Sequence, residues 1–340
     1  MHGVRIIFVT QEVDPASPVL GATVAKLRAL AARVDEVAVL ADRAVPEALP
    51  ENCRVHVFRS RWKAGRGVRF EAALARELRG RPAAVVAHMC PIYAILAAPL
   101  ARPLGVPVVL WFTHWKPSRL LRVAERVSTA VATVEQRSFP LSSAKVHAIG
   151  HGIDLADFRC AERPPREGLD LLSLARTSPA KGIETIVRAI ALVPEARLVQ
   201  HGPSLTEEER SHRRELEFLV TTLGLGDRVS IGEAVPRGAV PGLLGHADAL
   251  VNNMRAGATD KAVYEAAATC LPVLASNPAL DGFLPDELRF ARDDPESLAR
   301  RIRTLAGADR AALGRELRAR VEREHSVEGW ADRIVVLARA

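Results

Sequence analysis

The chain has few aromatic residues, few cysteines and no long apolar run. Aromatic side chains make up 4% of the 340 residues, so the hydrophobic cores must be built mainly from Ala, Val and Leu. The four cysteines lie far apart, with neither zinc-ligand spacing nor the dense framework of small secreted domains. The longest apolar stretch, residues 91–113, is broken by Arg102 and three prolines, which argues against a membrane-spanning helix. With no signal-peptide pattern either, we expect a soluble cytoplasmic protein.

The net positive charge of the chain comes from its first half. The formal net charge is +7, and lysine supplies only six of the 47 basic side chains. Residues 1–160 carry a balance of +9, and residues 161–340 a balance of −2. Such arginine-rich and alanine-rich usage often reflects a GC-rich genome. Since base-stacking aromatics and a recognisable binding module are also lacking, we expect no nucleic-acid partner.

Short apolar runs alternate with helical patterns in two successive series. This alternation predicts an α/β fold with parallel sheets covered on both faces. A proline-containing and charged segment at residues 160–168 indicates a linker. We expect two Rossmann-like domains, at residues 1–160 and 166–325, followed by a helix at about 326–340. Ligands of open α/β sheets bind at the carboxyl ends of strands, so we expect the site in the cleft between the domains. Among the predicted elements are a helix from Arg69 to Arg79 and a short strand from Leu288 to Ala291.

Two clusters in the second half could bind a diphosphate. Arg176 and Lys181 flank a loop between a predicted strand and a predicted helix, where cations and free backbone N–H groups attract anions. An exposed basic loop is the alternative interpretation. The second cluster, Thr259-Asp260-Lys261, also opens a helix, with Glu265 one turn inside it. Asp260 could be an ordinary N-cap and Glu265 a solvated carboxylate, or Glu265 could accept hydrogen bonds from ribose hydroxyls.

Five motifs in order make the chain resemble glycosyltransferase family 4, the retaining enzymes of the GT-B fold. The family's G-R-x4-K-G-like segment appears as Ala175-Arg176 … Lys181-Gly182, and its G-x-G-P-like segment as Gln-His201-Gly202-Pro203. Its donor-helix segment appears as Glu265 … Pro272-Val-Leu-Ala-Ser276, its interdomain motif as Gly150-His151-Gly152-Ile153-Asp154, and its last-helix segment as His325-Ser326 … Trp330. The resemblance implies a GT-B fold with a deep interdomain cleft, a C-terminal helix at about 326–340 that packs back on the first domain, and a hexosyltransferase-type activity.

The same resemblance assigns roles to particular residues. It implies catalytic roles for Arg176, Lys181 and His114, the last hydrogen-bonding the transferred sugar. The implied donor-binding residues are Gly202, Pro203, Thr259, Asp260, Lys261 and Glu265. Gly257 stands eight residues before Glu265, where many relatives have a sugar-binding glutamate, and Asp260 is our candidate to replace that contact. Gly21 and His151 are the candidate acceptor or cleft residues.

Two clusters of cations in the first half suggest an anionic partner. Residues 59–69 combine arginine, lysine, glycine and Trp62, and Arg119, Arg122 and Arg126 share one predicted helix face. This surface could grip an anionic acceptor or make peripheral contact with an acidic membrane at its inner face. A solvated arginine-rich surface is the alternative interpretation.

The resemblance implies sugar transfer from a nucleotide-diphosphate sugar to an acceptor hydroxyl with retention at the anomeric carbon. No D-x-D motif and no metal-ligand set is visible, so we expect no cofactor and a metal-independent reaction. No carboxylate is clearly placed as a nucleophile, so a front-face mechanism fits best. A nucleotide-sugar epimerase or phosphorylase, and a catalytically inactive nucleotide-sugar binding protein, are the alternatives. The identities of base, sugar and acceptor do not follow from the residues.

Overall fold

The computed structural model describes residues 4–17, 20–163 and 168–339, in two compact units. The first unit contains Met1–Asp154 together with Glu324–Ala340, and the second contains Leu155–Arg323. The two prolines of the predicted linker, Pro164 and Pro165, lie outside the described residues. Each unit is an α/β domain with a parallel sheet, which confirms the predicted fold class.

The first unit is built on a seven-stranded parallel sheet in the order β3-β2-β1-β4-β5-β6-β7. Its side chains alternate between two buried faces: Ile7 and Val9 of β1 point to one helical layer, whereas Phe8 contacts Trp330 in the other. The strands are β1 (Arg5–Val13), β2 (Glu36–Ala44), β3 (Cys53–Val57), β4 (Ala84–His88), β5 (Val108–Trp111), β6 (Ala130–Thr133) and β7 (Val146–Ala148).

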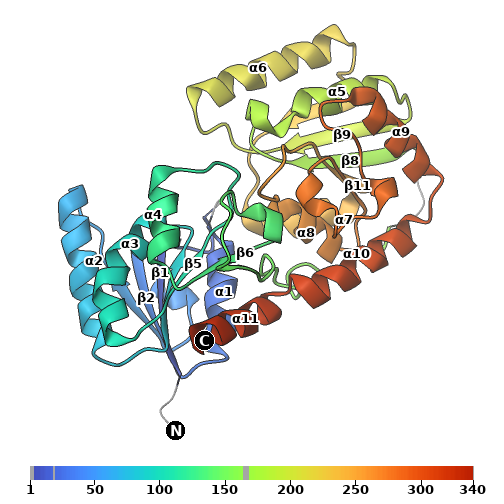
Figure 1. The fold of residues 1–340 in the computed structure, drawn as a ribbon. Helices are drawn as coiled ribbons and strands as arrows, with labels where there is room; N and C mark the ends of the chain where they lie inside the picture. The colour runs from blue at the N-terminus through green and yellow to red at the C-terminus, as the bar shows by residue number, and fades with distance from the viewer. Residues whose placement is uncertain (1–3, 18–19, 164–167, 340) are drawn as a thin grey trace. The chain divides into compact units, whose positions relative to one another are not determined.

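Helices cover both faces of this sheet (Figure 1). On one face, α3 (Pro91–Ala101) packs between α2 (Lys63–Leu78) and α4 (Arg119–Val127). On the other face, α1 (Ala22–Ala31) packs against α11 (Val327–Arg339), the last helix of the chain.

Helix α2 begins at Lys63, so the predicted start at Arg69 is wrong. The part of the helix that was not predicted contains Gly65 and Gly67, and a glycine inside a helix costs about 1 kcal/mol relative to alanine. Burial of Phe70, Leu74 and Leu78 against the sheet stabilises the helix by more than this local cost.

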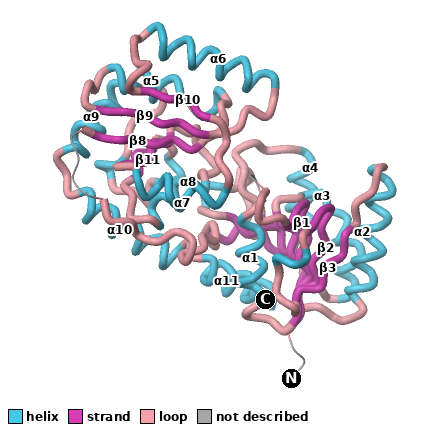
Figure 2. Tube along the Cα trace, turned by 180° about the vertical axis from the view of Figure 1, so that it is seen from behind, coloured by secondary structure: helices cyan, strands magenta, loops and turns pink. Residues whose placement is uncertain are grey.

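The second unit contains a five-stranded parallel sheet in the order β10-β9-β8-β11-β12 (Figure 2). Helix α5 packs with α6 and α9 on one side of it, and α7 and α8 lie on the other. The strands are β8 (Leu169–Leu174), β9 (Ala196–His201), β10 (Val229–Gly232), β11 (Ala249–Asn252) and β12 (Val273–Ala275). The helices are α5 (Ile183–Ala191), α6 (Glu207–Thr222), α7 (Val240–His246), α8 (Lys261–Ala268), α9 (Pro295–Ala306) and α10 (Arg310–Glu324).

The predicted strand from Leu288 to Ala291 is wrong. Pro285 precedes a short 3-10 turn over Asp286–Leu288, so Leu288, the first residue of the predicted strand, belongs to this turn. After the turn, Arg289 makes one isolated bridge with Ala275, so the segment adds no sixth strand to the sheet.

Two glycines let the chain pass close to the start of α11 in the first unit. Gly150 and Gly152 both have φ of +76°, a conformation that other residues rarely adopt. A Cβ at Gly150 would collide with the carbonyl of Glu324. Directly after them, Ile153 pairs with Ser326 and donates its N–H to the carbonyl of His325 at 2.7 Å. This contact joins the end of the first series of strands to the C-terminal helix.

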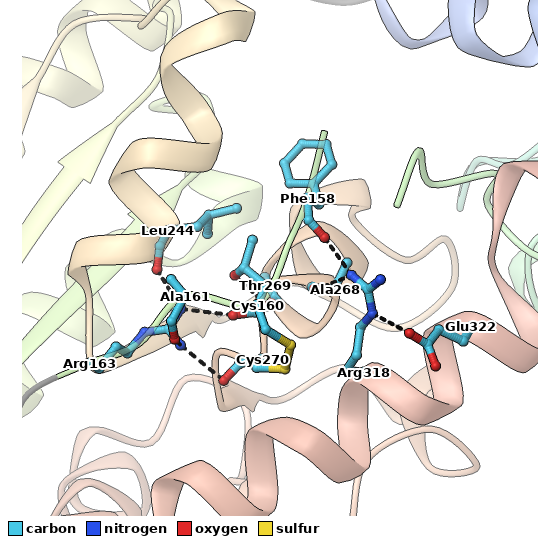
Figure 3. Close-up of a disulfide and its surroundings, with 11 residues drawn as sticks. Phe158, Cys160, Ala161, Arg163, Leu244, Ala268, Thr269, Cys270, Arg318 and Glu322 are labelled. Carbon is cyan, nitrogen blue, oxygen red and sulfur yellow. Dashed lines mark hydrogen bonds and ion pairs between the residues drawn. A yellow bond between two sulfur atoms is a disulfide. The ribbon is translucent and has the colours of Figure 1, made fainter. Parts of the chain in front are cut away.

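A disulfide that the sequence did not predict joins Cys160 to Cys270, at the end of α8 (Figure 3). Cys53 and Cys90 are free thiols. Arg163 holds the same region by donating hydrogen bonds to the carbonyls of Ala161, Leu244, Ala247, Thr269 and Cys270. Arg318 of α10 adds bonds to the carbonyls of Phe158 and Ala268. The segment around Cys160 is therefore fixed to the end of α8 by a covalent bond and two arginines.

Candidate active site

Loops at one edge of the second unit's sheet bring together the donor-binding residues predicted from the sequence. Arg176 and Lys181 follow β8, Gly202 and Pro203 follow β9, and Asp260 precedes α8 after β11. The three strands are parallel, so their carboxyl ends lie at the same edge. This edge is where ligands of open α/β sheets bind.

Lys181 and Asp260 form an ion pair across this edge. The Lys181 Nζ lies 2.5 Å from Asp260 Oδ1, and both side chains are mostly buried. Asn252, at the end of β11, donates from Nδ2 to the other carboxylate oxygen at 2.8 Å. The carboxylate of Asp260 thus fixes the position of the Lys181 ammonium between two loops.

The N-terminus of α8 lacks a side-chain cap. Asp260 occupies the N-cap position, but its carboxylate makes no capping hydrogen bond because Lys181 and Asn252 engage it. The interpretation of Asp260 as an ordinary capping residue is therefore wrong. The Val263 N–H donates to the Asp260 carbonyl at 3.2 Å, whereas the N–H groups of Lys261 and Ala262 precede any carbonyl that the helix could offer them and lie where an anion beside the Lys181 ammonium could accept from them.

Glu265 lies inside α8 and is not a solvated carboxylate. Its side chain is 3% exposed, and its Oε1 lies 2.5 Å from Arg237 and 3.3 Å from Lys261. Burial is the largest influence on Lys261 and lowers its pKa, while the Glu265 carboxylate acts in the opposite direction. Both cations contact Oε1, so Oε2 lies outside these two ion pairs.

Arg237 and Phe158 are residues of this site that sequence reasoning missed. The Arg237 guanidinium lies 5.0 Å from the centre of the Phe158 ring while it pairs with Glu265. Arg237 precedes α7 in a short 3-10 turn, far from any motif, so only the folded chain places it beside α8. Phe158 lies four residues after the interdomain motif Gly150-His151-Gly152-Ile153-Asp154, and the resemblance assigns it no role.

Arg176 is anchored to the start of α6. Its guanidinium is half-exposed and lies 3.1 Å from the buried carboxylate of Glu209. That carboxylate also accepts a hydrogen bond from the backbone N–H of Leu205 at 2.6 Å. The partners of Lys181 are Asp260 and Met254, so the two predicted cations share no partner among these contacts.

Gly202, Pro203 and Thr259 shape the loops through packing. A Cβ at Gly202 would collide with the carbonyl of Ala175, so only glycine fits where the loops after β8 and β9 meet. Pro203 accepts a hydrogen bond from the Thr177 N–H at 3.3 Å. Thr259 is buried and accepts a hydrogen bond from the Tyr264 hydroxyl at 3.1 Å.

Gly257 has a backbone conformation that explains why no glutamate stands there. Its φ is +109°, a region in which side chains other than hydrogen are strained. Asn277 holds the loop through hydrogen bonds from Nδ2 to the carbonyls of Gly257 and Ala258, at 3.5 and 3.1 Å. The departure from the family motif is therefore accommodated by the local backbone.

The candidate residues of the first unit also lie after its strands or at a helix start. His114 is exposed after β5, and its Nδ1 accepts the backbone N–H of Lys116 at 3.0 Å, which leaves the neutral ring's proton on Nε2. Gly21 occupies the N-cap position of α1, where a Cβ would lie 2.7 Å from the Ser17 carbonyl. His151 is buried, with its ring edge-on to Trp111 at 6.1 Å.

Residues 4–17, 20–163 and 168–339 contain no cluster of His, Cys, Asp and Glu side chains that could hold a metal ion. In the same part of the chain, none of the helices has both the length and the apolar character needed to cross a bilayer.

Comparisons with known proteins give one family match, which lies within the second unit. The sequence model described as "Glycosyl transferases group 1" matches residues 157–320. A search of curated proteins gives no significant match.

Several solved structures share the fold over nearly the whole chain. Sucrose-phosphate synthase from Thermosynechococcus elongatus is 20% identical, with a TM-score of 0.76 and coverage of 99% of this chain and 98% of its own. HepE from Anabaena, solved with UDP, is 18% identical, with a TM-score of 0.79 and coverage of 98% and 99%. A glycosyltransferase from Rickettsia africae is 15% identical, with a TM-score of 0.78 and coverage of 100% and 98%.

The family match covers the unit that holds the Lys181–Asp260 pair and the buried Glu265, and the matching structures share both sheets. The chain has the GT-B fold, and its residues 157–320 match the sequence model of glycosyl transferases group 1.

Proposed function

We propose that the chain transfers a sugar from a nucleotide-diphosphate sugar to an acceptor hydroxyl, with retention at the anomeric carbon and without a metal ion. One observation carries this proposal: the Lys181 ammonium is held by Asp260 beside the uncapped N-terminus of α8. Together they supply fixed positive potential where a departing diphosphate would need it.

The reaction breaks the bond between the anomeric carbon and the diphosphate oxygen. The acceptor oxygen forms its new bond to the same face of that carbon, and the acceptor's proton passes to the departing phosphate oxygen. The products are the glycosylated acceptor and the nucleoside diphosphate, so atoms and charge balance. The chain's part is to stabilise the charge that develops on the leaving group, through Lys181, Arg176 and the backbone N–H groups of α8.

Three further side chains orient the donor in this proposal. Glu265 accepts a hydrogen bond from a ribose hydroxyl through Oε2, while Arg237 and Lys261 hold Oε1. Asp260 accepts from a hydroxyl of the transferred sugar and takes the role that a glutamate at the position of Gly257 would have. His114 donates from Nε2 to that sugar. UDP-sugars are the donors to test first, because HepE was solved with UDP and with UDP-glucose.

Protein cations replace a divalent metal in this mechanism. If they do, turnover in excess EDTA equals turnover with added Mg²⁺ or Mn²⁺. A requirement for either ion would overturn this part of the proposal.

We also propose a cytoplasmic enzyme whose acceptor is anionic or is carried by an anionic surface. The +9 balance of residues 1–160 supports this acceptor class, since complementary charge raises encounter rates and affinity. Gly21 and His151 are the residues of the first unit that we propose to contact the acceptor.

The direct test is a panel of nucleotide sugars with hydroxyl acceptors, followed by NMR of the product. Release of nucleoside diphosphate that depends on the acceptor, with the donor's anomeric configuration kept, is the expected result. Inversion at the anomeric carbon would contradict the mechanism. A donor sugar altered without an acceptor would indicate an epimerase instead.

Gly257 favours one second candidate, a nucleotide-sugar binding protein without turnover. A glycine at position 257 lacks the carboxylate with which many family members contact the donor sugar. Nucleotide binding with no turnover across the whole panel would favour this candidate.

A further inference from the structure

A cavity of about 620 Å³ lies beside β12, at the edge of the second unit's sheet. Its walls include Ala275 and Ser276 at the end of β12, Ala256 from the loop before α8, residues 289–292, and the first two turns of α9, which packs against β12 and α5 (Figure 1). Small-molecule sites usually have volumes of about 300–1,000 Å³. The donor-binding residues proposed above follow β8, β9 and β11, and none of these described residues lines the cavity.

Three arginines line the cavity: Arg289, Arg292 and Arg301. Arg289 is neutralised by Asp281 and Asp286, whose carboxylates each lie 2.8 Å from its guanidinium. Asp286 also lines the cavity, but its side chain is 91% exposed and is engaged by Arg289. The positive charge available to a ligand therefore comes from the other two arginines.

The guanidinium groups of Arg292 and Arg301 are both partly buried and are oriented through Nε. Arg301 donates from Nε to the Arg289 carbonyl at 2.7 Å, and Arg292 Nε lies 3.3 Å from Asp293. Within residues 168–339, the Nη groups of these two arginines make no hydrogen bond or ion pair. Unused planar donors of this kind favour a phosphate, because arginine binds phosphate oxygens through paired hydrogen bonds.

Ser297 and Phe290 indicate the size and the character of the ligand. Ser297 Oγ accepts the Ala291 N–H at 3.0 Å, so its own proton can be donated to a ligand. Phe290 and Ala275 are buried and give the cavity an apolar wall. A bare phosphate ion would leave most of this volume unfilled. The cavity therefore fits a phosphate carried by a small organic body, of the size of a phosphorylated sugar.

Asn253 connects the cavity to the loop that holds Lys181. Its side chain is 1% exposed. From Nδ2 it donates to the Gly182 carbonyl at 3.0 Å and to Asp293 Oδ1 at 3.2 Å, while its Oδ1 accepts the Ser276 hydroxyl at 3.0 Å. Ser276 lines the cavity, and Asp293 directly follows its wall. One buried amide thus holds both the cavity wall and the residue next to Lys181.

Both segments lie close against this amide. A Cβ at Gly182 would lie 2.3 Å from Asn253 Nδ2. Asp293 has φ of +56°, which is uncommon for a residue other than glycine, and its N–H donates to Asn253 Oδ1 at 3.4 Å. A ligand that shifts residues 292–293 therefore shifts the hydrogen bonds that hold Gly182.

We propose that this cavity binds a small phosphate monoester, with Arg292 and Arg301 as its phosphate ligands, and that Asn253 couples it to the loop of Lys181. Binding of the monoester needs no nucleotide sugar and stands independently of the proposed reaction. The coupling rests on the proposed function, because it requires that the affinity for nucleotide changes when the cavity is filled.

The binding test is calorimetric titration of the full chain, without nucleotide, with glucose 6-phosphate, inorganic phosphate and glucose. We expect glucose 6-phosphate to bind at least tenfold more tightly than inorganic phosphate, and glucose not to bind. R292Q and R301Q should each weaken the binding of glucose 6-phosphate at least tenfold. R292Q removes no bond to the backbone, so it keeps the test decisive if R301Q does not fold.

Two controls separate this cavity from other cations of the second unit. R300Q removes a 64% exposed arginine from the same helix, one position from Arg301. Lys181→Ala removes the ammonium of the candidate donor site. Both should bind glucose 6-phosphate within twofold of the unmodified chain, and circular dichroism should show that each variant is folded.

Three results would overturn the site. The first is binding of glucose 6-phosphate that R292Q leaves unchanged or that Lys181→Ala abolishes. The second is inorganic phosphate binding as tightly as glucose 6-phosphate, which would indicate a simple anion site. The third is the absence of binding up to millimolar glucose 6-phosphate.

The coupling is tested by the Kd of UDP with and without saturating glucose 6-phosphate. We expect at least a threefold change in the unmodified chain and none in R292Q. Asn253→Ser should bind glucose 6-phosphate but lose the change in Kd. An unchanged Kd in the unmodified chain, or a retained change in Asn253→Ser, would overturn the coupling. If no nucleoside diphosphate binds, the coupling fails together with the proposed function, whereas the result with glucose 6-phosphate stands on its own.

Discussion

Lys181 and Asp260, 79 residues apart in the sequence, form an ion pair of 2.5 Å between the loops that follow β8 and β11. The pair positions an ammonium group at the sheet edge and also withdraws the Asp260 carboxylate from the N-terminus of α8. This one contact thus fixes the Lys181 ammonium and leaves the N-terminus of α8 without a side-chain cap, and both contribute positive potential to the candidate site.

Lys181→Ala should lower kcat/KM by two to three orders of magnitude. Loss of one fixed group that stabilises developing negative charge typically costs about 2.7–4 kcal/mol in the transition state. Steady-state kinetics with the best donor measures the effect. Arg188→Ala, which removes a half-exposed arginine from α5, is the control and should keep wild-type kinetics. Equal kcat/KM for the two variants would contradict the assigned role.

Glu265→Gln should weaken nucleotide binding and also destabilise the second unit. The substitution removes the ribose acceptor and leaves Arg237 and Lys261 near a neutral amide in a buried position, which is costly. Calorimetric titration with nucleoside diphosphate, run below the melting temperature of the variant, separates the two effects. A folded variant with an unchanged Kd would refute the contact with ribose.

The fold could be predicted from the sequence because each strand is a short aliphatic run between helices. Burial of both sheet faces demands such runs, and strands such as β4 and β11 consist of them. The wrong element bounds lie where local propensity and packing disagree. Gly65 and Gly67 disfavour a helix locally, yet Phe70 and Leu74 anchor the helix that contains them.

Reduction of the Cys160–Cys270 disulfide should lower the stability of the second unit by about 2–4 kcal/mol, since the bond closes a long loop in the unfolded chain. Nucleotide binding should persist, because Arg163 and Arg318 hold the same segments through backbone carbonyls. Thermal unfolding of a Cys53→Ser/Cys90→Ser variant, with and without dithiothreitol, isolates this bond. Identical unfolding curves would contradict the expected effect.

The first unit should lose stability below about pH 6.5 because of His88. Burial lowers the pKa of this histidine well below 6.5, and Lys26 acts in the same direction. As the pH falls, the unfolded chain binds a proton at this position before the folded chain does. The free energy of unfolding therefore decreases, by up to about 1.4 kcal/mol per pH unit.

His88→Phe keeps an aromatic ring against Trp111 and removes this titration. Urea unfolding at pH 7.5 and pH 5.5 should show a smaller acid loss for the variant than for the wild-type chain. His56, whose pKa is also lowered by burial, contributes equally to both proteins. The same acid loss in both would rule out His88 as its source.

The candidate site was only partly predictable. Lys181, Asp260 and Glu265 follow strands or open helices, so their motif spacing indicates where they lie. Arg237 could not be found in this way, because its contact with Glu265 depends on how α7 packs beside α8. The contacts of Asp260 with Lys181 and Asn252 likewise form only when the chain folds, so the local sequence pattern does not predict them.

Nucleotide binding at the Lys181–Asp260 edge is the central claim, and thermal unfolding with UDP, GDP, ADP and dTDP tests it most directly. A ligand at about 100 times its Kd stabilises the folded chain by about 2.7 kcal/mol. We predict that one of these diphosphates raises the melting temperature of the wild-type chain and of Arg188→Ala, and that Lys181→Ala loses most of this shift. No shift with any of the four, or an equal shift in Lys181→Ala, would contradict the claim.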